Sequence, residues 1–182
     1  MNDCPHRDSP IVIRPIAAGD RERLRESHER LSPETRYRRF LAVKPHLTSA
    51  DVRYLVDIDG RDHVALVATL PEAADEPIVG VARFIRIPDE PEVAEVAIVV
   101  NDALQGRGVG TELITRLAEA AVARGVRRFR ATMLADNSRV QRLFEALAAG
   151  PAQYRRTGAV SEMEFPLPAP GGTADPPALA AA

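Results

Sequence analysis

Residues 95–110 read Glu95-Val-Ala-Ile-Val-Val-Asn-Asp-Ala-Leu-Gln105-Gly-Arg-Gly-Val-Gly110, and they join two segments of different periodicity. The apolar run at 93–100 predicts a strand. From Val109 onward, apolar residues recur at helical spacing until Gly125, which is placed as the glycine that follows a helix end. A glycine-rich turn lies between them. The segment therefore predicts a strand, a loop and a helix in direct succession.

The glycine-rich turn has a physical use beyond reversing the chain. Glycines allow consecutive backbone N–H groups to turn inward, and the helix N-terminus adds a partial positive charge, so the main chain could hold a diphosphate. Arg107 could add a charge-assisted contact. A plain flexible turn between strand and helix is the competing interpretation.

Two familiar phosphate motifs do not match this turn. A dinucleotide fingerprint requires Gly-x-Gly-x-x-Gly, but counting from Gly106 the last position is Thr111. A P-loop requires Gly-Lys-Ser/Thr, and the only lysine of the chain is Lys44. Both motifs are excluded by spacing or residue type.

The rest of the chain predicts a mixed sheet with helices. Strand-like runs occupy residues 11–14, 63–70, 78–87, 126–134 and 161–167, and helical signals begin at Asp20, Ser32, Thr48 and Asn137. The order is strand, helices, a meander of three strands, then helix, strand, helix and strand. This order is typical of an α/β (α+β) fold with a mixed sheet.

Length and composition predict one domain. The chain has 182 residues, of which 45% are hydrophobic, enough for one sizeable core. Residues 1–9 are polar and residues 168–182 are rich in Pro, Ala and Gly, so we expect a disordered arm and tail around a domain at 10–167.

Charge, cysteine content and histidine spacing limit the kinds of partner and metal site that we expect for this protein. The net charge is -2, which gives no signature of nucleic-acid or membrane binding. The single cysteine, Cys4, cannot form an internal disulfide, and no export signal or apolar membrane span is visible. The four histidines show no ligand spacing. We expect a cytoplasmic protein without a metal.

The motif Gln105-x-x-Gly108-x-Gly110 resembles the Gln/Arg-x-x-Gly-x-Gly/Ala loop of the GNAT (GCN5-related) N-acetyltransferases. The first strand at 11–16 and the helix start at 137–144 are similar to that family as well. Residues 31–40, with Leu47-Thr48 and Asp51, further resemble the GNAT domains of bacterial protein lysine acetyltransferases. The resemblance implies a central, mostly antiparallel mixed sheet flanked by helices, with a splay between the fourth and fifth strands.

The resemblance also implies acetyl-CoA as cosubstrate and assigns roles to residues. Backbone amides of the loop would bind the CoA pyrophosphate, the end of the strand would pair with pantetheine, and the later helix start would lie near the pantetheine arm. The implied cofactor-binding residues are Gln105, Gly106, Arg107, Gly108, Val109, Gly110 and Thr111 in the loop, Ile98, Val99 and Val100 in the strand, and Asn137.

Glu95 is the candidate general base. A lysine-like ammonium has a reference pKa of about 10.4, so direct transfer needs a group that removes a proton. Glu95 interrupts an apolar strand and matches the acid of the lysine acetyltransferase-like relatives, and partial burial would raise its pKa. The alternative roles of Glu95 are a solvated edge acid or an ion pair with an arginine, and Glu90 and Glu92 are the reserve candidates for the base.

Phe144 departs from the family pattern, because many GNAT proteins carry a tyrosine there that is proposed to protonate the CoA thiolate. Solvent could protonate a thiolate of pKa near 8.5, or Tyr154 could substitute, so the general acid stays open. Three arginines, Arg36, Arg38 and Arg39, could form a solvated helix face or contact CoA or an acidic substrate.

The function predicted is transfer of an acetyl group from acetyl-CoA to a primary amine, preferably a protein lysine. A small-molecule amine acetyltransferase and a catalytically weak CoA-binding regulatory module are the alternatives. An open acceptor groove would favour a protein, and an enclosed acidic pocket would favour a small cation. Acyl preference and oligomeric state are not encoded in any visible motif.

Overall fold

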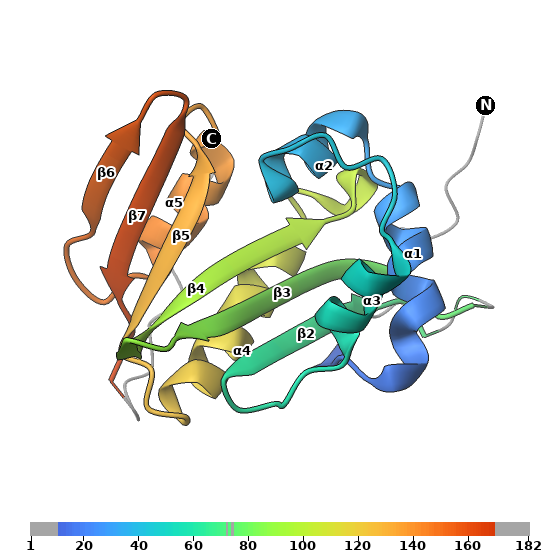
Figure 1. The fold of residues 1–182 in the computed structure, drawn as a ribbon, viewed down its shortest axis with the longest axis horizontal. Helices are drawn as coiled ribbons and strands as arrows, with labels where there is room; N and C mark the ends of the chain where they lie inside the picture. Colours follow the sequence, from blue (N-terminus) through green and yellow to red (C-terminus); the bar gives the residue numbers. More distant parts are fainter. Residues whose placement is uncertain (1–10, 72, 74, 170–182) are drawn as a thin grey trace.

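A computed structural model describes residues 11–71, 73 and 75–169 (Figure 1). The predictions of a disordered arm at 1–9 and of most of the tail at 168–182 concern residues outside this part. The elements are β1 (Val12–Pro15), η1 (Ala18–Asp20), α1 (Arg21–Glu29), α2 (Pro33–Phe40), α3 (Ser49–Val56), β2 (His63–Thr69), β3 (Ile78–Ile87), β4 (Glu90–Val100), η2 (Asp102–Leu104), α4 (Val109–Val122), β5 (Arg128–Leu134), α5 (Ser138–Leu147), β6 (Gln153–Thr157) and β7 (Val160–Pro166).

The predicted helix starts at Ser32 and Thr48 are present with their caps. The Ser32 hydroxyl accepts from the Thr35 amide at the start of α2, with Pro33 in the first helical turn. At α3 the Thr48 hydroxyl accepts from the Asp51 amide, and the Asp51 carboxylate accepts from the Thr48 amide. These reciprocal bonds satisfy N–H groups that a helix leaves without partners. Local sequence therefore sets where these short helices begin.

All the strands of the described chain form one sheet in the order β1-β2-β3-β4-β5-β7-β6, in which β4 and β5 pair in parallel and the other neighbours pair antiparallel. The expected mixed, mostly antiparallel sheet is confirmed. Helices α1 to α3 cover one face of β2 to β4 and α4 the other, as Figure 1 shows.

The core divides between the two faces. One cluster packs α4 and α5 against the sheet and includes Leu113, Leu117, Phe129, Phe144 and Phe165. The other packs α1 and α3 against the opposite face through Leu24, Val52, Leu55, Val67 and Val81. Because β2 and β3 are buried on both faces, their sequences are nearly continuous apolar runs rather than alternating ones.

One strand was missed by the sequence analysis, and another was predicted too short. Strand β6 was not expected, since Gln153–Thr157 is polar and every residue of it is exposed, so no alternation marks it. Strand β4 begins at Glu90 rather than at residue 93, because only a two-residue turn at Pro88 separates it from β3. The first correction adds an edge strand beyond β7, and the second lengthens β4 ahead of Glu95.

Candidate active site

The β4 and β5 strands separate partway along their length. Their parallel pairing runs through Val93, Ala94 and Glu95, whose partner is Arg130, and ends there. Beyond Glu95, β4 continues to Val100 paired with β3 alone. The divergence is visible in Figure 1, and it confirms the predicted splay. A strand edge that loses its neighbour presents N–H and C=O groups to whatever lies in the opening.

The glycine loop lies at the end of this opening, between β4 and α4. Gly106 and Gly108 have positive φ angles of 77° and 82°, a region that residues with a side chain rarely adopt. Gly108 is the N-cap of α4, and no side chain caps the helix there. The amides of Val109, Gly110 and Thr111 precede the first helical hydrogen bond, which Glu112 donates to Gly108. The loop therefore leads into the N-terminus of a 14-residue helix, and no side chain caps that helix.

Side chains outside the motif hold the loop in place. The side-chain amide nitrogen of Gln105 donates to the Val100 carbonyl at 3.1 Å. The side-chain oxygen of Gln105 accepts from Arg139 of α5 at 2.5 Å. Gln105 therefore connects the end of β4 to α5 across the opening. In this chain Gln105 therefore acts as both donor and acceptor.

Asp102 connects the same loop to α2. Its carboxylate accepts from the Ser32 amide and hydroxyl, both at 3.0 Å, and from the Thr35 hydroxyl at 2.6 Å. These partners lie 67 to 70 residues away in the chain, and sequence reasoning did not find them.

The predicted strand and helix residues lie around the opening. Ile98, Val99 and Val100 are partly buried at the end of β4. A Cβ built on Gly110 would lie 3.7 Å from Ile98 and from Val100, so the first turn of α4 packs closely on this strand. Asn137 is the N-cap of α5, where its side-chain oxygen accepts from the Val140 amide at 3.4 Å. Gln105, Gly110 and Asn137 are therefore brought to one region.

Glu95 lies where the two strands part, and its side chain is exposed. The partial burial expected of this side chain is not found. Its register partners are Ile85 on β3 and Arg130 on β5, so these three side chains share the sheet face that α1 to α3 cover. Within the described residues no ion pair involves Glu95.

Arg130 is held by two other carboxylates instead. It donates to both oxygens of Glu90 at 2.9 Å and to Glu164 at 2.6 and 2.9 Å. The hydrogen bond from Arg130 lowers the pKa of Glu90, and the two carboxylates raise the pKa of Arg130. An arginine directly beside Glu95 in the sheet is thus already occupied, which leaves Glu95 as a free carboxylate toward solvent.

A polar hollow of about 350 Å³ adjoins this network on the β5, β6 and β7 strands. It is lined by Glu90, Arg130, Gln153, Tyr154, Arg155, Glu162 and Glu164. Most of its lining comes from the C-terminal hairpin, which the sequence did not predict in full.

Neither Phe144 nor Tyr154 offers a free hydroxyl to the opening. Phe144 is only 2% exposed and its ring stacks on Phe165 at a centroid distance of 5.5 Å. The Tyr154 hydroxyl donates to Glu145 at 2.6 Å, and this hydrogen bond raises its pKa. A raised pKa makes a phenol a weaker acid, so the geometry gives Tyr154 no advantage as a proton donor.

The three arginines of α2 were predicted either to form a solvated helix face or to contact CoA or an acidic substrate, and they lie in different surroundings. Arg36 donates to the Pro45 carbonyl at 2.6 Å, and Arg38 pairs with Glu34 and Asp136 near the surface. Arg39 points the other way and lines a small cavity under the helix. The solvated-face interpretation therefore fits Arg36 and Arg38 but not Arg39.

Among residues 11–71, 73 and 75–169, no helix is long and apolar enough to cross a membrane. No group of three or more His, Cys, Asp or Glu side chains in the same part of the chain could hold a metal ion.

Comparison with known proteins agrees with this geometry. Acetyltransferase Pat of Mycolicibacterium smegmatis is 39% identical over 139 residues, which are 76% of this chain and 41% of that protein. Acetyltransferase PA5475 of Pseudomonas aeruginosa is 34% identical over 137 residues, which are 75% of this chain and 73% of that protein. The chain thus spans less than half the length of the Pat relative.

The crystal structure of the GNAT domain of S. lividans PAT is 35% identical, with a TM-score of 0.75. The match covers 85% of this chain and 89% of that one. Residues 22–149 also match the acetyltransferase (GNAT) family as a whole. With its splayed sheet and its glycine loop at the start of α4, the chain belongs to the acetyltransferase (GNAT) family.

Proposed function

We propose that the protein transfers an acetyl group from acetyl-CoA to a primary amine, preferably the side chain of a protein lysine. The observation that supports this most is the place of Glu95. Its carboxylate is exposed at the point where β4 and β5 part, and the glycine loop lies at the other end of the same opening.

The opening has the length that an extended cofactor arm needs. From Glu95 to Val100 the strand advances five residues at about 3.3 Å each, roughly 16 Å in all. We assign the pyrophosphate to the amides from Gly106 to Thr111, where the helix dipole favours an anion. Ile98, Val99 and Val100 would bind pantetheine through their main chain, with Asn137 beside it.

The chemistry assigned to Glu95 is proton removal from the acceptor ammonium, directly or through one water. The neutral amine nitrogen then attacks the thioester carbon, and a backbone N–H in the opening stabilises the oxyanion of the tetrahedral intermediate. When that intermediate collapses, the C–S bond breaks, the electron pair leaves on sulfur, and the nitrogen gives up its second proton to solvent to form the neutral amide. Solvent supplies the proton to the thiolate, since neither Phe144 nor Tyr154 is placed to do so.

The acceptor side favours a lysine on a protein over a small amine. Strand β6, which lines the polar hollow, is exposed along its whole length, so the surface is open rather than enclosed. The hollow has three carboxylates, Glu90, Glu162 and Glu164, against the two guanidinium groups of Arg130 and Arg155. One net negative charge is left to attract a cationic side chain. A small-amine acetyltransferase would need a more enclosed pocket than this one.

The test is CoA release from acetyl-CoA with a panel of peptide and small-amine acceptors, using Glu95→Gln and Glu92→Gln. Glu92 is the matched control because it is an exposed glutamate on the same strand. We expect Glu95→Gln to lower kcat by at least about 100-fold, the usual contribution of a general base, while acetyl-CoA still binds. Full activity of Glu95→Gln across pH would refute the base, and binding of acetyl-CoA without turnover by the unaltered protein would identify a regulatory module instead.

A further inference from the structure

Arg83 of β3 is a buried cation without a buried anion. It is 4% exposed, and its Nε is a buried atom with no hydrogen-bond partner in the described structure. Its Nη1 donates to the Leu55 carbonyl at 3.1 Å and to His63 Nε2 at 3.0 Å, both neutral acceptors. Burying a guanidinium charge with neutral partners alone is costly, so a missing counter-ion is the natural explanation.

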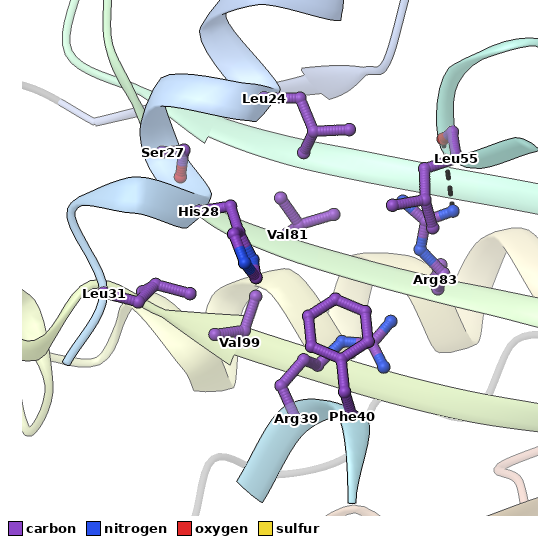
Figure 2. Close-up of a pocket in the computed structure, with 10 residues that line it drawn as sticks. All are labelled: Leu24, Ser27, His28, Leu31, Arg39, Phe40, Leu55, Val81, Arg83 and Val99. Carbon is purple, nitrogen blue, oxygen red and sulfur yellow. Dashed lines mark hydrogen bonds between the residues drawn. The ribbon is translucent and has the colours of Figure 1, made fainter. Parts of the chain in front are cut away.

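A second arginine faces the same space. Arg83 and Arg39 both line a cavity of about 30 Å³ between α1, α2 and the sheet (Figure 2). In the described ranges no ion pair with a carboxylate involves either of them. Burial lowers the pKa of Arg39 to about 10, and burial together with the Arg39 charge lowers that of Arg83 to about 9. Two cations therefore line one cavity, and the charge of Arg39 disfavours the charged form of Arg83.

The other polar groups of the cavity do not supply the missing charge. His28 is hydrogen-bonded through Nε2 to the Lys44 carbonyl at 2.8 Å, and burial lowers its pKa, so it is neutral near pH 7. Ser27 contributes only a hydroxyl. The remaining lining side chains, apart from the two arginines, are apolar: Leu24, Leu31, Phe40, Leu55, Val81 and Val99.

Size and geometry select the ligand. At roughly 10–15 Å³ for each water-sized group, the cavity holds two or three such groups. Since Nη1 of Arg83 is used by Leu55 and His63, the edge formed by Nε and Nη2 is what faces a ligand. That edge matches the two oxygens of a carboxylate, which a guanidinium binds in parallel.

We propose that Arg83 and Arg39 form a binding site for one carboxylate group, with the Arg83 edge binding it in bidentate fashion and Arg39 adding the second charge. The site adjoins the reaction centre. Arg83 pairs with Ala97, two residues from Glu95 on β4 and on the same sheet face. The carboxylate is either a free small anion or part of an acceptor that also presents its amine to Glu95.

The binding test uses formate, which is small enough for the cavity and needs no turnover. Sodium formate is titrated against sodium chloride at constant ionic strength, and the melting temperature and the formate Kd are measured. We expect formate to raise the Tm of the unaltered protein, because a ligand that binds only the folded state stabilises it. Arg39→Gln should weaken formate binding by about tenfold or more, the loss expected for a charge-assisted pair.

Arg38→Gln is the matched control, since Arg38 lies on the same helix but pairs at the surface, and it should leave the formate Kd unchanged. Arg83→Gln is a second variant; if it does not fold, Arg39→Gln still decides the outcome. The proposal is overturned by two results together. The first is that formate and chloride affect the unaltered protein equally, or that Arg39→Gln binds formate as tightly as the unaltered protein does. The second is that the peptide KM values show no preference for a carboxylate.

A second measurement distinguishes a free small anion from a carboxylate that belongs to the acceptor. Acceptor peptides with Glu or Gln next to the lysine are compared by KM. A lower KM for the Glu peptide that disappears in Arg39→Gln identifies the acceptor as the source, whereas formate binding without a KM difference identifies a free anion. Both outcomes support the site, and the formate arm holds even if the protein shows no acetyl transfer.

Discussion

Replacing Gly108 with alanine tests whether the backbone shape of the loop, rather than its side chains, binds acetyl-CoA. Gly108 has φ 82° and ψ -10° at the N-cap of α4, and a Cβ built there meets no atom within 4 Å. The substitution therefore creates no clash. Its only cost is the left-handed backbone conformation, about 1–2 kcal/mol for a residue with a side chain.

That cost appears in one of two measurable ways. If alanine keeps the loop conformation, the free energy of unfolding falls by about 1–2 kcal/mol. If the loop relaxes instead, its amides leave the positions that hold the pyrophosphate, and the Kd for acetyl-CoA rises by about 5- to 30-fold. The loss of unfolding free energy measured in urea and the loss of acetyl-CoA binding free energy measured by titration should therefore add up to about 1–2 kcal/mol.

Gly110→Ala is the control within the same motif. A Cβ there lies 3.7 Å from its three nearest atoms, which is ordinary contact, and alanine favours a helix over glycine by about 1 kcal/mol. We expect unchanged acetyl-CoA binding and equal or higher stability. If Gly108→Ala binds and unfolds like the unaltered protein, or if Gly110→Ala loses as much, the backbone explanation of the loop is wrong.

Three further predictions concern groups near the site. Phe144→Tyr should destabilise the fold by about 1–3 kcal/mol, because the new hydroxyl enters a buried stack with Phe165, and it should not increase kcat; thermal unfolding and CoA release check both. Tyr154→Phe should keep kcat within about twofold across pH, because its hydroxyl is bound to Glu145; a large loss of kcat at neutral pH, where the phenol carries its proton, would identify it as the acid. Burial, aided by the Arg83 charge, lowers the pKa of His63 to about 4, so the unfolded chain takes up a proton near pH 6.5 before the folded one does. The stability that neutral His63 contributes is complete above pH 6.5 and is lost as pH falls toward 4, by no more than about 3 kcal/mol, and His63→Gln should flatten this part of the pH profile of unfolding.

The elements that carry the cofactor loop could be predicted because their signals are local. The apolar spacing after Val109, the glycine at 125 and the capping residues Ser32 and Thr48 each act within one helical turn, and the structure confirms them. The splay followed from the resemblance of the Gln105 to Gly110 motif to a known family rather than from periodicity.

The parts that were missed depend on register across the sheet. Arg130 meets Glu90 and Glu164 over separations of 40 and 34 residues, and no pattern in the sequence marks such a network. Arg83 stands in an apolar run that is buried on both faces, so alternation could not show that it faces the α1 to α3 side. Strand β6 has no buried face, and its extended conformation follows from pairing with β7.

The polar character of β6 has a consequence for how the protein behaves in concentrated solution. As the last strand of the sheet it exposes a row of hydrogen-bonding groups that a second copy could extend into a continuous sheet. Adjacent Arg155 and Arg156 place two positive charges along that edge, so approaching copies repel each other before their backbones can pair. The same charges leave this edge accessible to a partner of opposite charge.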